Sequence, residues 1–335
     1  MTQEKIPWQP IVAKYQFPDV WRSVWQIANT LIPFSVLWYA MYRSLAVSYW
    51  LTLLLAVPTA GFLVRAFIIF HDCCHGSFFK TAKANDRLGL MLGVLTLTPY
   101  YRWKHEHGIH HATSGDLDRR GTGDVWTMTV EEYLAAPWWK RIAYRLMRNP
   151  FILFTVGAFL LFAVAQRVAP PSANRRELNS VIWTDLAIAA MFGWLMLMVG
   201  WKAVLLIELP VWLITSSVGV WLFYVQHNFD PTYWERHDKW EFFKAGMDGS
   251  SFYKLPKILQ WFSGNIGFHH IHHLSPKIPN YKLEQCHREN TLFQIEPLTF
   301  RESFKGLFYR LWDEKRGRLV GFGALKQYRR KAPVS

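Results

Sequence analysis

Cysteine is scarce in this chain, with Cys73, Cys74 and Cys286 the only three among 335 residues. Their spacing matches neither zinc ribbons nor iron–sulfur clusters, and adjacent cysteines seldom form a disulfide framework. We therefore expect a reducing, cytosolic setting. We also expect no cleavable signal, because the polar N-terminal residues, with Lys5 and Lys14, are not followed by a short apolar core.

Several functional modules are absent as well. The chain has no dinucleotide-binding glycine fingerprint, no b-type haem domain and no cysteine set for an iron–sulfur cluster. If the protein is redox-active, its electrons must come from a partner. The net charge of +14 comes without a nucleic-acid recognition motif or an isolated basic domain. We therefore assign the charge to contact with anionic lipid headgroups or an acidic partner protein, and expect no nucleic acid.

Long apolar runs alternate with polar ones, so 51% of the residues are apolar although the mean hydropathy is +0.02. A membrane span needs roughly 20 mainly apolar residues. The runs that meet this are 24–42, 47–70, 184–200 and 203–225. Residues 88–99 and 151–164 are shorter and contain glycine, so we expect interfacial or re-entrant segments there.

Parity and charge then set the topology. If the histidine clusters described below share one site, an even number of crossings must separate them, which excludes 151–164 as a span. The arginines that follow this segment, Arg167, Arg175 and Arg176, favour the cytosol. We predict an all-α integral membrane protein in which four transmembrane helices form two hairpins, at 24–70 and 184–226. Residues 1–23, 71–183 and 227–335 are expected to be cytosolic, with 71–183 partly interfacial and a helical cap carrying the histidines.

The tail is predicted to contain an amphipathic helix. Thr299 and Glu302 fit a capping box. Apolar residues then share one helical face, and they are Phe300, Phe304, Leu307, Phe308 and Leu311. Such a helix can lie on anionic lipid or pack on the cytosolic region.

Ten of the thirteen histidines fall into three short segments, and the spacing places most of them on shared helix faces. Residues at i, i+3 and i+4 point the same way on a helix. The sets predicted to converge are His71 and His75, then His107, His110 and His111, then His269, His272 and His273. His227 follows the fourth apolar run directly, so we expect it at the same depth as a ninth ligand. His105 and His270 fall off these faces, so we expect them to contact ligands indirectly or to have structural roles. His237 and His287 lie in charged segments and are expected at the surface.

Eight or nine imidazoles are too many for one metal ion, so the pattern predicts two. Imidazole suits iron, zinc, copper and nickel, and ligand type alone does not choose among them. A dinuclear all-nitrogen site at the bilayer surface suits oxidation of an apolar chain, which iron with oxygen can carry out and zinc cannot. A zinc hydrolase or a metal-binding transporter of the membrane is the non-redox alternative. Isolated histidines are usually core residues, but three clusters beside membrane runs are not explained that way.

The three clusters resemble the histidine boxes of the membrane fatty acid desaturase family. The resemblance extends through Trp103-Lys104, His110-His111-Ala112-Thr113, the run 121–126 (Gly-Thr-Gly-Asp-Val-Trp) and the run 268–283. It covers nearly the whole chain and is strongest to bacterial acyl-lipid (phospholipid) desaturases of the cold-inducible or Δ12/ω-6 type. Related hydroxylases, ketolases and alkane monooxygenases share the boxes, so a lipid or carotenoid hydroxylase or ketolase stays the alternative.

The resemblance implies that the eight box histidines are metal ligands and that Gln226-His227 matches an additional family histidine. Carboxylates near the boxes are candidates to orient ligating imidazoles, namely Asp72, Glu106, Asp116 and Asp124, and Asn265 is a possible indirect contact. The implied cofactor is a pair of non-haem irons with O2 as co-substrate. The implied reaction forms a cis double bond in a lipid acyl chain, with a ferredoxin-type electron donor, at a cytosolic active site in the cell (inner) membrane. The sequence sets neither the bond position, the acyl carrier nor the oligomeric state.

Overall fold

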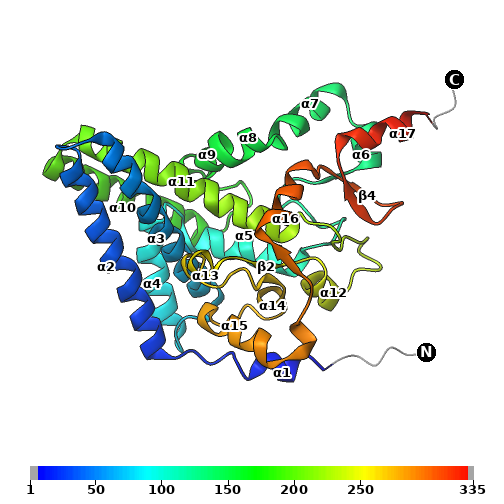
Figure 1. The fold of residues 1–335 in the computed structure, drawn as a ribbon, viewed down its shortest axis with the longest axis horizontal. Coiled ribbons are helices and arrows are strands. Elements are labelled where there is room, and N and C mark those ends of the chain that lie inside the picture. Colours follow the sequence, from blue (N-terminus) through cyan, green and yellow to red (C-terminus); the bar gives the residue numbers. More distant parts are fainter. Residues whose placement is uncertain (1–6, 331–335) are drawn as a thin grey trace.

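The computed structural model describes residues 7–330, and the chain is mostly helical (Figure 1). Two pairs of long helices form its framework. The first pair is α2 (Val20–Ser44) and α3 (Tyr49–His75), and the second is α10 (Arg175–Val199) and α11 (Trp201–His227). α3 packs against α2 on one side and against α11 on the other. Helices therefore form where the four apolar runs were predicted.

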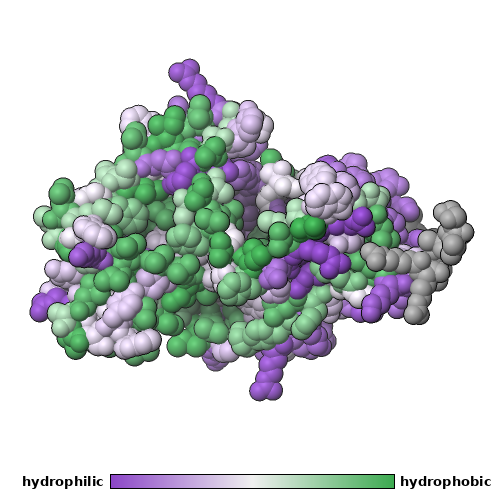
Figure 2. All heavy atoms as spheres, turned by 90° about the horizontal axis from the view of Figure 1, so that it is seen from above, coloured by the Kyte–Doolittle hydropathy of each residue, from purple (hydrophilic) through white to green (hydrophobic). Residues whose placement is uncertain are grey.

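These helices are apolar along most of their length, and many of their large side chains face outward. Exposed apolar residues follow α2, α10 and α11, such as Trp25, Trp194 and Leu197. Figure 2 shows hydrophobic side chains over much of one face, while hydrophilic residues gather toward one end. Prolines stand inside α2, α3 and α11, which membrane helices tolerate. An outward apolar surface of this kind suits contact with lipid.

Four stretches of the described chain are long and apolar enough to cross a membrane. They are Tyr49–His75, Pro150–Arg167, Arg175–Val199 and Trp201–His227. α2 is long enough but is not among these four, because it is less apolar. Pro150–Arg167 extends the region 151–164 that we expected to be interfacial or re-entrant. Length and composition therefore do not decide between α2 and Pro150–Arg167, and the four predicted spans stay a prediction.

Shorter helices gather at the histidine-bearing ends of α3 and α11. α4 (Ala82–Leu95) turns sharply at Leu97 into α5 (Tyr100–Thr113), and both pack against α3 and α10. The other helices of this part are α1 (Gln9–Ala13), α12 (Phe242–Met247), α13 (Lys257–Phe262), α14 (His269–Leu274), α15 (Asn280–Glu289) and the 3-10 turn Thr291–Phe293. The core around α14 and α15 includes Ile271, Ile278 and Phe293.

Another run of helices connects α5 to α10 along the upper edge of Figure 1. It consists of α6 (Val130–Ala135), α7 (Trp138–Met147), α8 (Pro150–Ile152), a π-helical turn (Leu153–Gly157), α9 (Ala158–Ala163) and a 3-10 turn (Ala165–Arg167). α9 and the π-helical turn pack against α11.

Two small sheets depart from the all-α prediction. β1 (Met128–Thr129) pairs in parallel with β4 (Leu311–Asp313), which pairs antiparallel with β5 (Arg318–Val320). β2 (Phe252–Lys254) and β3 (Pro297–Thr299) form a parallel pair. The chain ends in a 3-10 turn (Phe322–Ala324) and α17 (Leu325–Arg330). The fold is therefore mostly, not entirely, helical.

The predicted amphipathic helix of the tail is wrong beyond its first turns. Both bonds of the Thr299–Glu302 capping box form, but α16 covers only Phe300–Ser303 and continues as the 3-10 turn Phe304–Phe308. The carbonyl of Gly306 accepts hydrogen bonds from Tyr224 Oη at 2.9 Å and Asn228 Nδ2 at 3.1 Å. Tertiary bonds thus take the acceptor that a longer helix would use, and Leu311 lies in β4 instead.

Candidate metal centre

Four helices bring the predicted histidines to one place. His71 and His75 end α3, which stops at Gly76 because that residue adopts a left-handed φ of +65°. His227 ends α11, and the other two sets lie on α5 and α14. The structure thereby gathers all nine histidines that the sequence singled out, and it sorts them into two groups.

The first group contains five imidazoles, from His71, His75, His107, His111 and His272. Nε2 of His111 lies 3.1 Å from Nε2 of His107 and 3.1 Å from Nε2 of His272. The second group contains four imidazoles, from His110, His227, His269 and His273. Nε2 of His227 lies 3.2 Å from that of His110 and 3.0 Å from that of His269.

Neighbouring histidines divide between the groups. His107 joins its i+4 partner His111 in the first group, while His110 faces the second. On α14, His269 and His273 share the second group, and His272 turns to the first. The groups touch where the rings of His111 and His273 stack with centroids 4.2 Å apart. The two groups are thus built from helix positions that alternate between them.

The nitrogen spacing fits ligands around a shared ion. Two nitrogens each about 2.1 Å from one ion lie about 3.0 Å apart at a right angle and about 3.4 Å apart at a tetrahedral angle. The observed Nε2–Nε2 distances of 3.0 to 3.2 Å match the first arrangement. Among the residues that the structure describes, neither group includes a carboxylate or a thiolate. The donor set is all nitrogen.

Burial favours the neutral form of several of these imidazoles, which is the form that binds metal. Burial lowers the pKa of five of them well below the usual 6.5, and neighbouring imidazoles lower it further; these are His107, His111, His269, His272 and His273. Nε2 of His75 is buried without a hydrogen-bond partner. A bound ion explains such an unpaired nitrogen.

Hydrogen bonds at the outer ring nitrogens aim several imidazoles inward. Nδ1 of His110 lies 2.6 Å from Asp124 Oδ1, and Nδ1 of His71 lies 3.3 Å from Asp72 Oδ1. Nδ1 of His227 lies 3.1 Å from the carbonyl oxygen of Gly249. In each case Nε2 is left to face its group, which is how metal-binding proteins orient imidazole ligands.

The predicted orienting residues separate into two sets. Asp72 and Asp124 contact histidines of the groups, as stated above. Glu106 pairs with Arg102 at 3.0 Å instead, because it sits one turn after that arginine on α5. Asn265 bonds within the turn before α14, accepting from Gln260 Nε2 at 3.0 Å and donating to the carbonyl of Asn280 at 3.3 Å.

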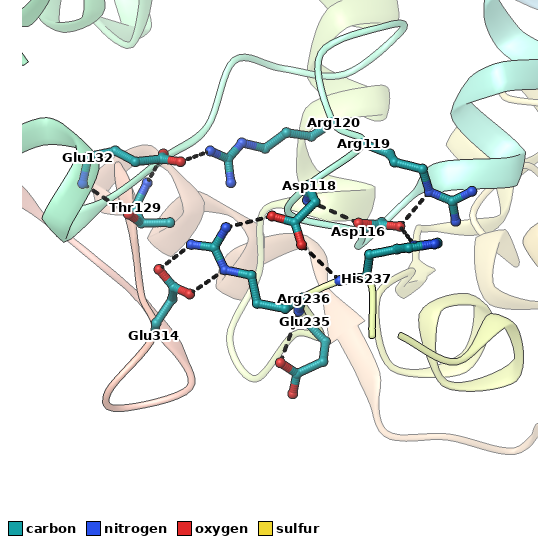
Figure 3. Close-up of polar contacts among 10 residues, drawn as sticks. All are labelled: Asp116, Asp118, Arg119, Arg120, Thr129, Glu132, Glu235, Arg236, His237 and Glu314. Carbon is teal, nitrogen blue, oxygen red and sulfur yellow. Dashed lines mark hydrogen bonds and ion pairs between the residues drawn. The ribbon is translucent and has the colours of Figure 1, made fainter. Parts of the chain in front are cut away.

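Asp116 is buried in an ionic network outside the groups (Figure 3). Its carboxylate binds Arg119 at 2.6 Å and His237 Nδ1 at 2.8 Å. Burial alone would raise the pKa of Asp116, but the bonds to Arg119 and His237 lower it below its usual value. Nearby, Arg236 bridges Asp118 at 2.6 Å and Glu314 at 2.8 Å. The network ties the loop after α5 to the segment before α12 and to the β4–β5 hairpin.

The remaining histidines lie outside both groups. His105 lies outside both groups, as its place off the shared face indicated, but it is exposed on α5, where a structural role was expected. His270 is buried and pairs with the carbonyl of Phe293 at 2.9 Å, which is a structural role. His287 was expected on the surface, but it is only partly exposed because its ring packs on Phe252 with centroids 4.5 Å apart.

Sequence reasoning missed some supporting residues. Asn280 donates its backbone and side-chain N–H groups to Asp72 Oδ2 at 2.7 and 2.8 Å, which fixes the carboxylate beside His71. Trp103 stacks on His107 with centroids 4.2 Å apart. Asn280 follows a proline at a helix start and carries no distinctive signal, whereas Trp103 lies at i−4 from His107 and could have been assigned to its face.

A small pocket of about 20 Å³ lies beside the second group, at the end of α11. It is lined by residues that include Ser114, Asp124, Val125, Phe223 and His227. The ring of Phe223 lies 5.1 Å from that of His110 and 5.4 Å from that of His227. Apolar and polar side chains therefore meet directly beside the imidazoles.

Comparison with known proteins gives consistent matches. A sequence model of fatty acid desaturases matches residues 44–294. A fatty acid desaturase of Bacillus subtilis (strain 168) is 51% identical over 316 residues, covering 94% of this chain and 90% of the relative. In Synechocystis sp. (strain ATCC 27184 / PCC 6803 / Kazusa), an sn-1 acyl-lipid omega-3 desaturase (ferredoxin) is 27% identical, covering 74% of this chain and 66% of the relative. An sn-1 oleoyl-lipid 12-desaturase of the same organism is 28% identical, covering 68% of this chain and 65% of the relative.

Proposed function

Because the chain belongs to the fatty acid desaturase family and is an oxidoreductase, we propose that it forms a cis double bond in acyl chains of membrane lipids, using O2 and two histidine-bound irons. The resemblance inferred from the histidine boxes is thereby confirmed. The observation that carries the proposal is the pair of adjoining imidazole groups at the ends of two apolar helices.

The proposed ligands are the five imidazoles of the first group for one iron and the four of the second for the other. Iron supplies the redox chemistry with oxygen that an unactivated C–H bond requires. Two electrons from a donor, two protons and the two hydrogens of neighbouring methylenes reduce O2 to two waters. The protein's part is to orient the imidazoles, chiefly through Asp72, Asp124 and the carbonyl of Gly249.

We assign the apolar side chains beside the second group to the acyl chain. Phe223 and Val125 line the pocket beside His227. An alkyl chain has no polar handle, so its position depends on packing against such side chains. Because Phe223 contacts two imidazoles, its ring limits how close a methylene approaches them.

We further propose hairpins at 24–70 and 184–226 that cross the cell (inner) membrane, with the three remaining parts, 1–23, 71–183 and 227–335, on the cytosolic side. Parity supports this, since His111 and His227 lie in adjoining groups and an even number of crossings must separate them. α10 and α11 supply two crossings. Pro150–Arg167 would add a third, so it does not cross.

We propose an acidic ferredoxin as the electron donor. One Synechocystis relative is an sn-1 acyl-lipid omega-3 desaturase (ferredoxin), and this chain carries a net charge of +14. Opposite charges speed encounter, and salt screens them. Turnover limited by the donor should therefore slow as salt is added, and salt-insensitive turnover would argue against this docking.

Expression with iron in a host of known lipid composition tests the function. Gas chromatography with mass spectrometry of the lipids should reveal a new cis double bond, and the His272→Ala variant should leave the profile unchanged. The matched control is His105→Ala, which alters an exposed histidine outside both groups. An oxygenated product would instead indicate a hydroxylase or ketolase, and an unchanged profile under active electron supply would contradict the proposal.

A further inference from the structure

Helix α7 leaves one apolar face uncovered. The exposed residues on this face are Trp138 at 69%, Trp139 at 59%, Ile142 at 50% and Leu146 at 53%. The other face is closed, because Tyr144 is fully buried and its hydroxyl accepts a hydrogen bond from the backbone of Met128 at 3.1 Å. A helix with one packed face and one bare apolar face needs a partner for the second.

Charge indicates which partner. Lys140 and Arg141 lie at the two edges of the packed face of α7, on either side of Tyr144, where each is partly exposed, and the first turn of the helix contains no acidic residue. Two adjacent tryptophans beside basic residues are typical of helices that lie in the headgroup layer of a membrane. An anionic lipid surface matches both the apolar face and the cations, whereas an acidic protein alone would leave the tryptophans uncovered.

Continuity with the apolar segment supports the same partner. α7 leads through Arg148 and Asn149 into Pro150–Arg167, which is apolar enough for lipid. α7, α8 and α9 follow one edge of the molecule in Figure 1. Figure 2, which looks down on this edge, shows hydrophobic side chains over much of it, with hydrophilic residues gathered toward the end that carries the C-terminus. The bare face of α7 therefore extends a surface that already suits the bilayer.

Both ends of the segment are attached to helices that carry the histidines. Arg148 is buried, and its Nη2 donates to Asn228 Oδ1 at 2.8 Å, one residue after His227. At the other end, Arg102 of α5 donates to the carbonyls of Ala165 at 2.9 Å and Val168 at 2.8 Å. A segment tied at both ends to the same side of the membrane returns to that side.

We propose that α7 is an interfacial anchor, seated in the anionic phospholipid headgroups of the bilayer face nearest the histidines, with Pro150–Arg167 dipping into that leaflet without crossing. Through Arg148 and Asn228, the anchor holds the end of α11, and with it His227, at a fixed depth. This placement concerns the fold and the membrane only. It holds whether or not the protein desaturates lipids.

Spin labelling of the full chain in lipid nanodiscs tests the anchor. A nitroxide is attached at Ile142→Cys, with Lys315→Cys on the β4–β5 hairpin, whose native side chain is 71% exposed, as the control. The three native cysteines are buried, so they do not compete for the label. Each disc holds one copy of the protein in phosphatidylcholine and phosphatidylglycerol.

The Ile142 label should collide with a water-soluble nickel chelate several-fold less often than the Lys315 label, and more often with dissolved O2. Replacing the phosphatidylglycerol with phosphatidylcholine should increase nickel access at 142, and K140Q/R141Q should remove this lipid dependence. Equal nickel access at 142 and 315 would overturn the proposal. So would protection at 142 that requires a second copy or an added electron-donor protein, because the face would then be a protein interface.

Discussion

The carboxylate of Asp124 lies 2.6 Å from Nδ1 of His110, a residue fourteen positions earlier in the chain. The loop after α5 thus folds back onto the helix that it leaves. Gly123 allows this return, because its φ of +72° and its lack of a side chain let the loop pass against His110. Asp124 fixes which nitrogen of His110 faces the second group, so the loop takes part in building the candidate metal centre.

Replacing Asp124 with asparagine should weaken metal binding at the second group. The amide keeps the shape but loses the charge that holds the His110 N–H. Loss of such a partner typically lowers metal affinity about 10–100-fold. Titration of the metal-free protein with Fe(II) measures the effect. The exposed Asp238→Asn is the control, and equal affinities for the two variants would contradict the role of Asp124.

Gly123→Ala should destabilise the protein and reduce its bound metal. A Cβ at this position would lie 2.9 Å from Cβ of His110 and 3.1 Å from the carbonyl oxygen of Glu106. The left-handed φ adds about 1–2 kcal/mol of strain for a residue with a side chain.

Gly108→Ala on the same stretch of chain is the matched control. Gly108 lies inside α5, where a Cβ meets nothing within 4 Å. Alanine there should stabilise the helix by about 0.5–1 kcal/mol relative to glycine. The melting temperature should therefore fall for Gly123→Ala and rise for Gly108→Ala. A fall of similar size in both melting temperatures would refute the loop geometry.

Removing one histidine of the second group should empty that group while leaving the first occupied. His269→Ala takes one of four imidazoles, so the purified variant should retain about one iron per chain. His105→Ala should keep the full content, since His105 lies outside both groups. Metal analysis of the two proteins makes the comparison. If His269→Ala lost no iron, the assignment of His269 would be wrong.

Helical spacing was enough to predict which histidines converge, because i, i+3 and i+4 positions share a face. It was not enough to divide them. His110 and His111 are adjacent in sequence yet face different groups, and this depends on where α11 and α14 pass α5. Such a division follows from tertiary packing that one helical pattern does not contain.

The errors in the tail and at the carboxylates have a similar cause. The tail has the apolar spacing of a helix, but tertiary bonds to Gly306 and the pairing of Leu311 in β4 override it. Charged residues near the boxes had several possible partners, and Glu106 and Asp116 form ion pairs with Arg102 and Arg119. α7 was missed although Trp138, Ile142 and Leu146 repeat at a spacing of four, which is a readable amphipathic signal.

The iron content of purified, active protein tests the central claim most directly. Inductively coupled plasma mass spectrometry on protein that converts lipid should give about two irons per chain, as nine imidazoles in two groups require. Mössbauer spectra should show those irons in nitrogen-rich, non-haem sites. Fully active protein that contains zinc without iron, or no metal, would contradict the account.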